Sequence, residues 1–140
     1  MILKCDSCGK RNRVRKNGGS IPKCGSCGES LRFADTPFEI TDMNFESMIG
    51  KTDFPVVLDL WAAWCAPCRM FAPTVAGLAK ELAGRAMVAK LDTESNQRTA
   101  ARFRIQSIPT VLIFNKGEVV DRMVGVQTRD SVMRALAPYL

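Results

Sequence analysis

Histidine is absent from all 140 residues of this chain. Imidazole, a frequent metal ligand and general base in proteins, therefore plays neither role here. Aromatic side chains are scarce, since the sequence holds seven Phe, two Trp and one Tyr. No apolar run approaches the ~20 residues that a membrane-spanning helix needs. Any chemistry must come from other side chains, and no association with a membrane is expected.

The first residues, Met1 to Cys5, lack the apolar core of a secretory signal. We therefore expect a cytoplasmic protein, in a compartment that keeps thiols reduced. Six cysteines in such a setting indicate metal binding or catalysis rather than structural disulfides. The length of 140 residues leaves room for one ordinary domain and a small appendage.

Acidic residues are scarce in residues 1–34, which we call the head. This segment contains two Asp or Glu and eight Lys or Arg. Residues 35–140, the body, hold twelve of each sign, so the net charge of +6 belongs to the head. Basic clusters can contact phosphates or an acidic protein. The basic run from Lys10 to Lys16 has no interleaved aromatic to stack on bases, which favours a solvated loop. Nucleic acid is therefore not the expected partner.

The head contains two Cys-x-x-Cys pairs separated by fifteen residues, and a glycine follows each pair. Four thiolates at this spacing favour a closed tetrahedral Zn²⁺ site, with no open position for a substrate. A segment with so few apolar side chains needs the metal to supply its folding free energy. We predict one structural zinc per chain; an iron-bearing site or two redox disulfides are the alternatives. The predicted ligands are Cys5, Cys8, Cys24 and Cys27.

A third Cys-x-x-Cys pair, Cys65 and Cys68, lies between an apolar run at 55–61 and a helical pattern at 70–82. A pair at a strand-to-helix junction is typical of a redox dithiol, because the two sulfurs lie one helical turn apart. Backbone N–H groups and the helix dipole would stabilise the thiolate of Cys65 at the helix N-terminus. Cys65 is thus the predicted nucleophile and Cys68 the resolving thiol. A buried or zinc-bound pair is the alternative, which the strand-then-helix setting disfavours.

The remaining patterns predict an α/β fold with a mixed sheet, because strands and helices alternate before a closing hairpin. The expected strands are 38–40, 55–61, 86–91, 110–114 and 118–124, and the expected helices are 41–49, 70–82, 94–103 and 128–137. Asp59 interrupts an apolar strand, so its pKa should be raised if it is buried. A solvent-facing Asp59 paired with Lys90 is the equal alternative.

The motif WCAPC, followed downstream by Ile108-Pro109-Thr110, resembles the centre of thioredoxin, which is usually WCGPC. The resemblance covers about residues 36–140 and includes Asp59, Lys90 and Gly125 at matching places. With its four-cysteine head, the chain resembles the zinc-bearing thioredoxin 2 subfamily. Ala66 stands where the family usually has Gly, which adds a methyl group at the rim of the site.

This resemblance implies a thioredoxin fold over residues 35–140, with a mixed central sheet flanked by helices, after a zinc-ribbon-like module at 1–34. It implies that Asp59 accepts the proton of Cys68 through water, with Lys90 modulating its charge. It also implies a cis bond before Pro109, where a trans bond is the alternative. The implied substrate groove is formed by Trp64, Ile108, Pro109 and Gly125.

The expected function is reduction of protein disulfides, because Ala66-Pro67 carries no positive charge of the kind that makes such a pair oxidising. Electrons would come from an NADPH-dependent thioredoxin reductase. The GxGxxG nucleotide fingerprint is absent, so no organic cofactor is expected in this chain. The alternative is a zinc-dependent redox sensor, or a binding module whose basic head recognises an acidic partner or nucleic acid.

Overall fold

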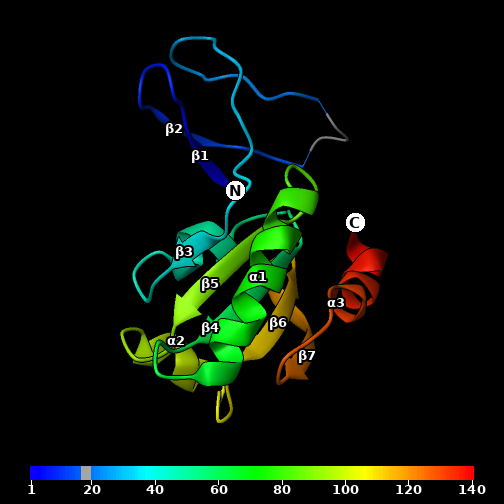
Figure 1. Ribbon diagram of the computed structural model, residues 1–140. Helices are drawn as coiled ribbons and strands as arrows, with labels where there is room; N and C mark the ends of the chain where they lie inside the picture. Colours follow the sequence, from blue (N-terminus) through cyan, green and yellow to red (C-terminus); the bar gives the residue numbers. More distant parts are fainter. Residues whose placement is uncertain (17–19) are drawn as a thin grey trace.

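The computed structural model describes residues 1–16 and 20–140. The body is built on a five-stranded mixed sheet (Figure 1). The strand order is β3-β5-β4-β6-β7. Strands β3 and β4 run parallel to β5, whereas β6 is antiparallel to both β4 and β7. The strands are β3 (Phe38–Ile40), β4 (Val56–Trp61), β5 (Met87–Asp92), β6 (Thr110–Asn115) and β7 (Glu118–Val124). The predicted thioredoxin fold and its closing hairpin are confirmed.

Each face of the sheet is covered by helices. The long helix α1 (Ala66–Glu81) and α3 (Arg129–Leu136) pack on one face, where Val57 of β4 is buried. The other face, with Leu58 of β4, packs against a π-helical turn η1 (Glu46–Gly50) and against aromatic residues next to α2 (Gln97–Arg102). A short 3-10 turn, η2 (Ala137–Tyr139), follows α3. Successive residues of β4 point to opposite faces of the sheet, so its apolar residues contribute to the core on both faces.

Three predicted helices differ from the observed ones. The helix expected at 70–82 begins at Ala66, directly after its N-cap residue Cys65. The expected helix at 94–103 begins only at Gln97, because a turn precedes it. In this turn Oδ1 of Asp92 accepts the backbone N–H of Glu94, and the carbonyl of Asp92 accepts Nδ2–H of Asn96. At 41–49 the chain forms turns and then the π-helical turn, after a reciprocal cap in which Thr41 and Asn44 bond to each other's backbone N–H groups. The observed strand bounds lie within one residue of the prediction at either end.

The head contains a two-stranded sheet, β1 (Ile2–Lys4) paired antiparallel with β2 (Arg11–Arg13). Leu3 and Leu31 of the head are each 4% exposed and belong to the same apolar cluster as Phe54 of the body. The backbone N–H of Lys16 also lies 3.1 Å from both carboxylate oxygens of Asp53. The head therefore packs against the body at the residues that lead into β4.

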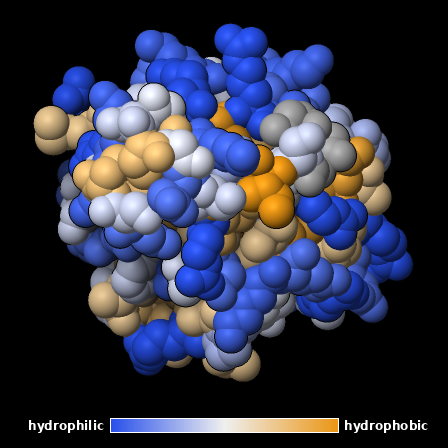
Figure 2. Space-filling model, turned by 90° about the horizontal axis from the view of Figure 1, so that it is seen from above, coloured by the Kyte–Doolittle hydropathy of each residue, from blue (hydrophilic) through white to orange (hydrophobic). Residues whose placement is uncertain are grey.

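The head and the start of α1 lie at opposite ends of the sheet (Figure 1). The head contacts the chain just before β4, whereas Cys65 follows the other end of that six-residue strand. At about 3.3 Å per residue the strand alone separates the two by roughly 20 Å. The face that carries the head is mostly hydrophilic, with small apolar spots (Figure 2). Among the described residues, no helix has the length and apolar character needed to span a bilayer.

Candidate functional site

Cys65 and Cys68 lie where the chain leaves β4 and enters α1, as the sequence predicts. Cys65 is the N-cap residue of α1, and its Sγ accepts a hydrogen bond from the backbone N–H of Cys68 at 3.2 Å. The two residues form a disulfide with a Cα–Cα distance of 5.3 Å. Pro67 occupies the first turn, where the helix needs no N–H from it. The N–H of Cys68, one of the amides that this helix end leaves without an intrahelical partner, therefore faces the sulfur of Cys65.

Two other segments meet the dithiol. The Ile108–Pro109 peptide bond is cis, as the resemblance implies. The carbonyl oxygen of Ile108 lies 3.7 Å from Sγ of Cys65. Gly125, at a φ of 90°, donates its backbone N–H to the carbonyl of Pro109 at 2.8 Å. The structure therefore brings Ile108, Pro109 and Gly125 together beside the disulfide.

Trp64 lies at the edge of the same site and is 67% exposed. Its indole Nε1–H donates to Oε1 of Glu94 at 2.6 Å, so the ring is held although it faces solvent. Glu94 is not among the residues predicted for the site. It lies 30 residues further along the chain in a turn, and no spacing in the sequence connects it with Trp64.

Asp59 is 1% exposed. It lies two residues after Val57 in β4 and therefore on the same face of the sheet, which α1 covers. Burial raises the pKa of its carboxyl group to about 7, and the charge of Lys90 on the neighbouring strand opposes this rise. The Lys90 ammonium lies 4.5 Å from the ring centroid of Trp61. Among the described residues, Oδ1 of Asp59 has no hydrogen-bond partner. The expectation of a raised pKa is confirmed, and Asp59 is not solvent-facing.

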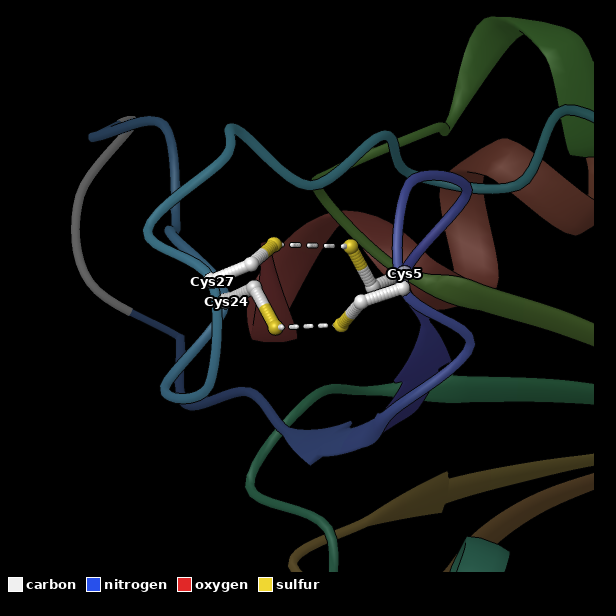
Figure 3. A group of neighbouring side chains, drawn as sticks. Cys5, Cys24 and Cys27 are labelled. Carbon is white, nitrogen blue, oxygen red and sulfur yellow. Dashed lines mark hydrogen bonds between the residues drawn. The ribbon is translucent and has the colours of Figure 1, made fainter.

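The four head cysteines point toward one centre from two facing loops (Figure 3). Sulfur–sulfur distances are 3.6 Å for Cys5–Cys27 and 3.6 Å for Cys8–Cys24, and all four sulfurs lie within 4.8 Å of one another. A tetrahedral Zn²⁺ with Zn–S bonds near ~2.3 Å requires sulfurs roughly 3.8 Å apart. The donor set and its spacing therefore fit a four-thiolate metal ion.

The two cysteine loops of the head have the same local structure. In each, the glycine after the second cysteine donates its N–H to the carbonyl of the first, Gly9 to Cys5 at 2.9 Å and Gly28 to Cys24 at 3.0 Å. Both glycines have φ values in the left-handed region, 77° and 80°, which residues with a side chain rarely adopt. These turns explain why a glycine follows each pair in the sequence.

Hydrogen-bond donors gather around Cys24. The backbone N–H groups of Cys27 and Ser26, with the side chain of Asn12, lower the pKa of this thiol to about 6. Such donors favour the thiolate, the form that binds a metal ion. Asn12 was not predicted as part of the site, because a lone Asn after a Cys-x-x-Cys pair carries no distinctive signal in the sequence.

Comparison with known proteins gives consistent matches. The family model described as Thioredoxin matches residues 36–138. The chain is 43% identical to Thioredoxin C-3 of Corynebacterium nephridii over 126 residues, which is 89% of this chain and 86% of that protein. It is 42% identical to Thioredoxin 2 of Chlorobaculum tepidum over 103 residues, which is 74% of this chain and 94% of that protein. The solved structure of a mutant thioredoxin from Halobacterium salinarum NRC-1 superimposes with a TM-score of 0.69 at 32% identity, covering 75% of this chain and 91% of that one.

Proposed function

This chain belongs to the thioredoxin family and is a thiol–disulfide oxidoreductase of proteins, and on that premise we propose that Cys65 attacks and Cys68 resolves in the reduction of substrate disulfides. The observation that carries the assignment is the position of Cys65 at the N-terminus of α1, where the N–H of Cys68 points at its sulfur. This donor and the helix dipole favour a thiolate at Cys65 once the disulfide is reduced.

The proposed reaction has two exchange steps. The Cys65 thiolate attacks one sulfur of the substrate disulfide, so a mixed disulfide forms while the substrate S–S bond breaks and its other sulfur leaves as a thiol after protonation. Cys68 then loses its proton and attacks Sγ of Cys65. This second step forms the Cys65–Cys68 disulfide and releases the other substrate thiol. The substrate gains two electrons and two protons, and the protein dithiol loses them.

We assign Asp59 as the group that receives the proton of Cys68, with Lys90 tuning its charge. A carboxyl group with a pKa of about 7 exchanges its proton readily at neutral pH. Asp59 lies on the sheet face that α1 covers, and Cys68 lies in the first turn of that helix. The partner-free Oδ1 leaves room in its hydrogen bonding for a bridging water molecule.

We propose that the surface around Trp64, Ile108, Pro109 and Gly125 receives the substrate. The carbonyl of Ile108 lies beside Sγ of Cys65, so an extended peptide pairing with this backbone would bring its own sulfur to the nucleophile. Trp64 adds an exposed aromatic surface at the edge. Disulfide-containing proteins are thus the proposed substrates.

We also propose the direction and setting of the reaction. The uncharged Ala66-Pro67 pair offers no extra cation to the thiolate, which favours a reducing dithiol. Such a dithiol needs an electron source, for which we propose an NADPH-dependent thioredoxin reductase. A cytoplasmic location, where thiols are kept reduced, agrees with this direction.

For the head we propose one structural Zn²⁺, held by Cys5, Cys8, Cys24 and Cys27. The spacing of the sulfurs and the soft thiolate donors support zinc. The four thiolates would hold the ion between the two cysteine loops, where it would link them and take no part in catalysis. Residues 1–34 would then form a metal-stabilised module in front of the thioredoxin domain at 35–140.

Insulin reduction with NADPH and thioredoxin reductase tests the catalytic proposal. We expect Cys65→Ser to reduce insulin no faster than the buffer, because the nucleophile is missing. Cys68→Ser should instead accumulate a mixed disulfide between Cys65 and the substrate, seen by mass spectrometry, because the resolving thiol is missing. If Cys65→Ser retains activity, or if the trapped adduct forms at another cysteine, the assignment of Cys65 is wrong.

A further inference from the structure

Asn12, in the middle of β2, connects the two cysteine loops of the head. Its side-chain Nδ2 donates to the carbonyl of Lys10 at 3.0 Å and to Sγ of Cys24 at 3.5 Å. Its Oδ1 accepts the backbone N–H of Gly25 at 3.0 Å. Both polar atoms of this one amide are therefore engaged within the head.

These partners belong to different loops. The carbonyl of Lys10 closes the first loop, because it also accepts the backbone N–H of Cys5 at 2.8 Å. Gly25 lies inside the second loop, between Cys24 and Cys27. Asn12 therefore spans the gap across which the metal ion would have to hold two pairs of thiolates. Cysteines aside, it is the one side chain among the described residues that donates a hydrogen bond to a head sulfur.

The alternation of β2 explains why this residue reaches inward. Asn12 pairs with Leu3 of β1, while its neighbours Arg11 and Arg13 are exposed to solvent. Residues on either side of a strand position point to the opposite face, so a single inward-facing polar residue lies between two outward-facing cations. An amide suits this place because it offers donors to a carbonyl and a thiolate and an acceptor to an N–H at once.

From these contacts we infer that Asn12 is a positioning residue for the head metal: it holds the thiolate of Cys24 and fixes the second cysteine loop against the first. This inference depends on the zinc site proposed above. Groups that hydrogen-bond metal ligands orient them and strengthen metal binding, and a site that binds its metal less tightly releases it faster. The amide would keep Cys24 aimed at the ion and would stabilise its negative charge when the ion begins to dissociate.

The rate of zinc transfer from the full-length protein to an excess of a chromophoric chelator tests this role. We expect Asn12→Ala to transfer its zinc about 10–100-fold faster than the wild type. Asn44→Ala is the matched control, because Asn44 braces backbone groups in the body in the same way, through Glu39 O at 3.0 Å and Thr41 N at 2.7 Å, without touching the head cysteines. It should transfer zinc at the wild-type rate.

A second variant, Asn12→Asp, guards against simple unfolding of the head. Asp keeps an oxygen for the N–H of Gly25 but replaces the amide donors with a negative charge facing the thiolates. We expect its Gly25 amide to stay protected in hydrogen exchange by NMR, while its zinc leaves at least as fast as from Asn12→Ala. In Asn12→Ala the same amide should lose its protection.

The outcomes separate the inference from the zinc proposal. Wild-type protein that retains one zinc while both Asn12 variants release it at the wild-type rate would overturn the role of Asn12 alone. Wild-type protein purified with zinc in the medium but carrying no stoichiometric metal would overturn the metal site, and the role of Asn12 with it. Faster release from both variants, with unchanged release from Asn44→Ala, supports the inference.

Discussion

The head and the body use the same Cys-x-x-Cys spacing for different purposes. In the head, each pair is followed by a glycine with a φ near 80°, and each sulfur has a sulfur of the other pair as its neighbour at 3.6 Å. In the body, the pair opens a helix, and Cys65 and Cys68 bond to each other. Spacing alone therefore does not determine what a cysteine pair does.

The backbone that follows the first cysteine makes the difference. A glycine turn folds the chain back and leaves both sulfurs free to meet a second pair, which suits a shared metal ion. A helix places the second cysteine one turn along, under the first, and gives the first sulfur the free N–H groups of the helix end. The two sites also lie at opposite ends of the sheet, so a change at the residues of one does not touch the residues of the other (Figure 1).

Replacing a head cysteine should give the largest effect. We expect Cys24→Ser to lower zinc affinity by several orders of magnitude, because four-ligand zinc sites derive about 10–16 kcal/mol from binding. Chelator competition measures this loss, with Ser26→Ala as a control that keeps the backbone N–H near Cys24. Insulin reduction should persist in both. Parallel loss of zinc and of activity would contradict the separation of the two sites.

Removing the buried acid of the body should stabilise the protein at neutral pH. The folded chain keeps the Asp59 proton up to about pH 7, whereas the unfolded chain releases it near about pH 4, so stability falls as pH rises through this window. We expect oxidised Asp59→Asn to gain about 4 kcal/mol over the wild type at pH 8 and little at pH 4. Denaturant unfolding at the two pH values measures the gain.

The same variant should reduce insulin more slowly, because the resolving cysteine loses its proton acceptor. Asp121→Asn, on the exposed strand β7, is the control for an equal change of charge. An Asp59→Asn protein whose extra stability is the same at both pH values would show that Asp59 does not carry the raised pKa.

A cavity in the head should destabilise the body, because the two share one apolar cluster. Leu31→Ala removes a side chain that is 4% exposed, and we expect a loss of about 2–4 kcal/mol. Both tryptophans lie in the body, so their fluorescence reports its unfolding. Ile21→Ala is the control, since Ile21 is 71% exposed. An unshifted body transition in Leu31→Ala would show that the head unfolds independently.

The smallest effect is expected at the edge of the dithiol site. Glu94→Ala removes the acceptor of the Trp64 indole N–H, and an exposed hydrogen bond is worth about 1 kcal/mol, so KM for insulin should rise less than about tenfold. The value of kcat should change little, because neither sulfur is touched. Glu94→Gln keeps an acceptor oxygen and should resemble the wild type. An equal loss in both variants would assign the effect to charge instead.

The sequence predicts those features that depend on neighbouring residues. The strand before WCAPC, the helix after it and the hairpin around Lys116-Gly117 follow from hydrophobic period and turn residues, and all are confirmed. The family resemblance added the cis bond before Pro109 and the buried position of Asp59, which local pattern alone left open.

Contacts between distant segments were not predictable in the same way. Glu94 reaches Trp64, and Asn12 reaches Gly25, only because the fold brings these distant segments together. The polar turn at Asp92 likewise displaced the start of α2, since the carboxylate of Asp92 accepts the N–H of Glu94, the first residue of the predicted helix. Such residues are polar, lie in loops or short strands, and have no periodic pattern.

The apolar cluster shared between head and body has a consequence for the order of folding. The amino-terminal segment leaves the ribosome first. All four head cysteines are therefore outside the ribosome before Phe54 and the sheet, against which Leu3 and Leu31 pack. A metal ion can join the two cysteine loops at that stage. The apolar side chains of the head nevertheless stay exposed to water until the later strands are synthesised. The nascent chain therefore carries a sticky surface for as long as the next few dozen residues take to emerge.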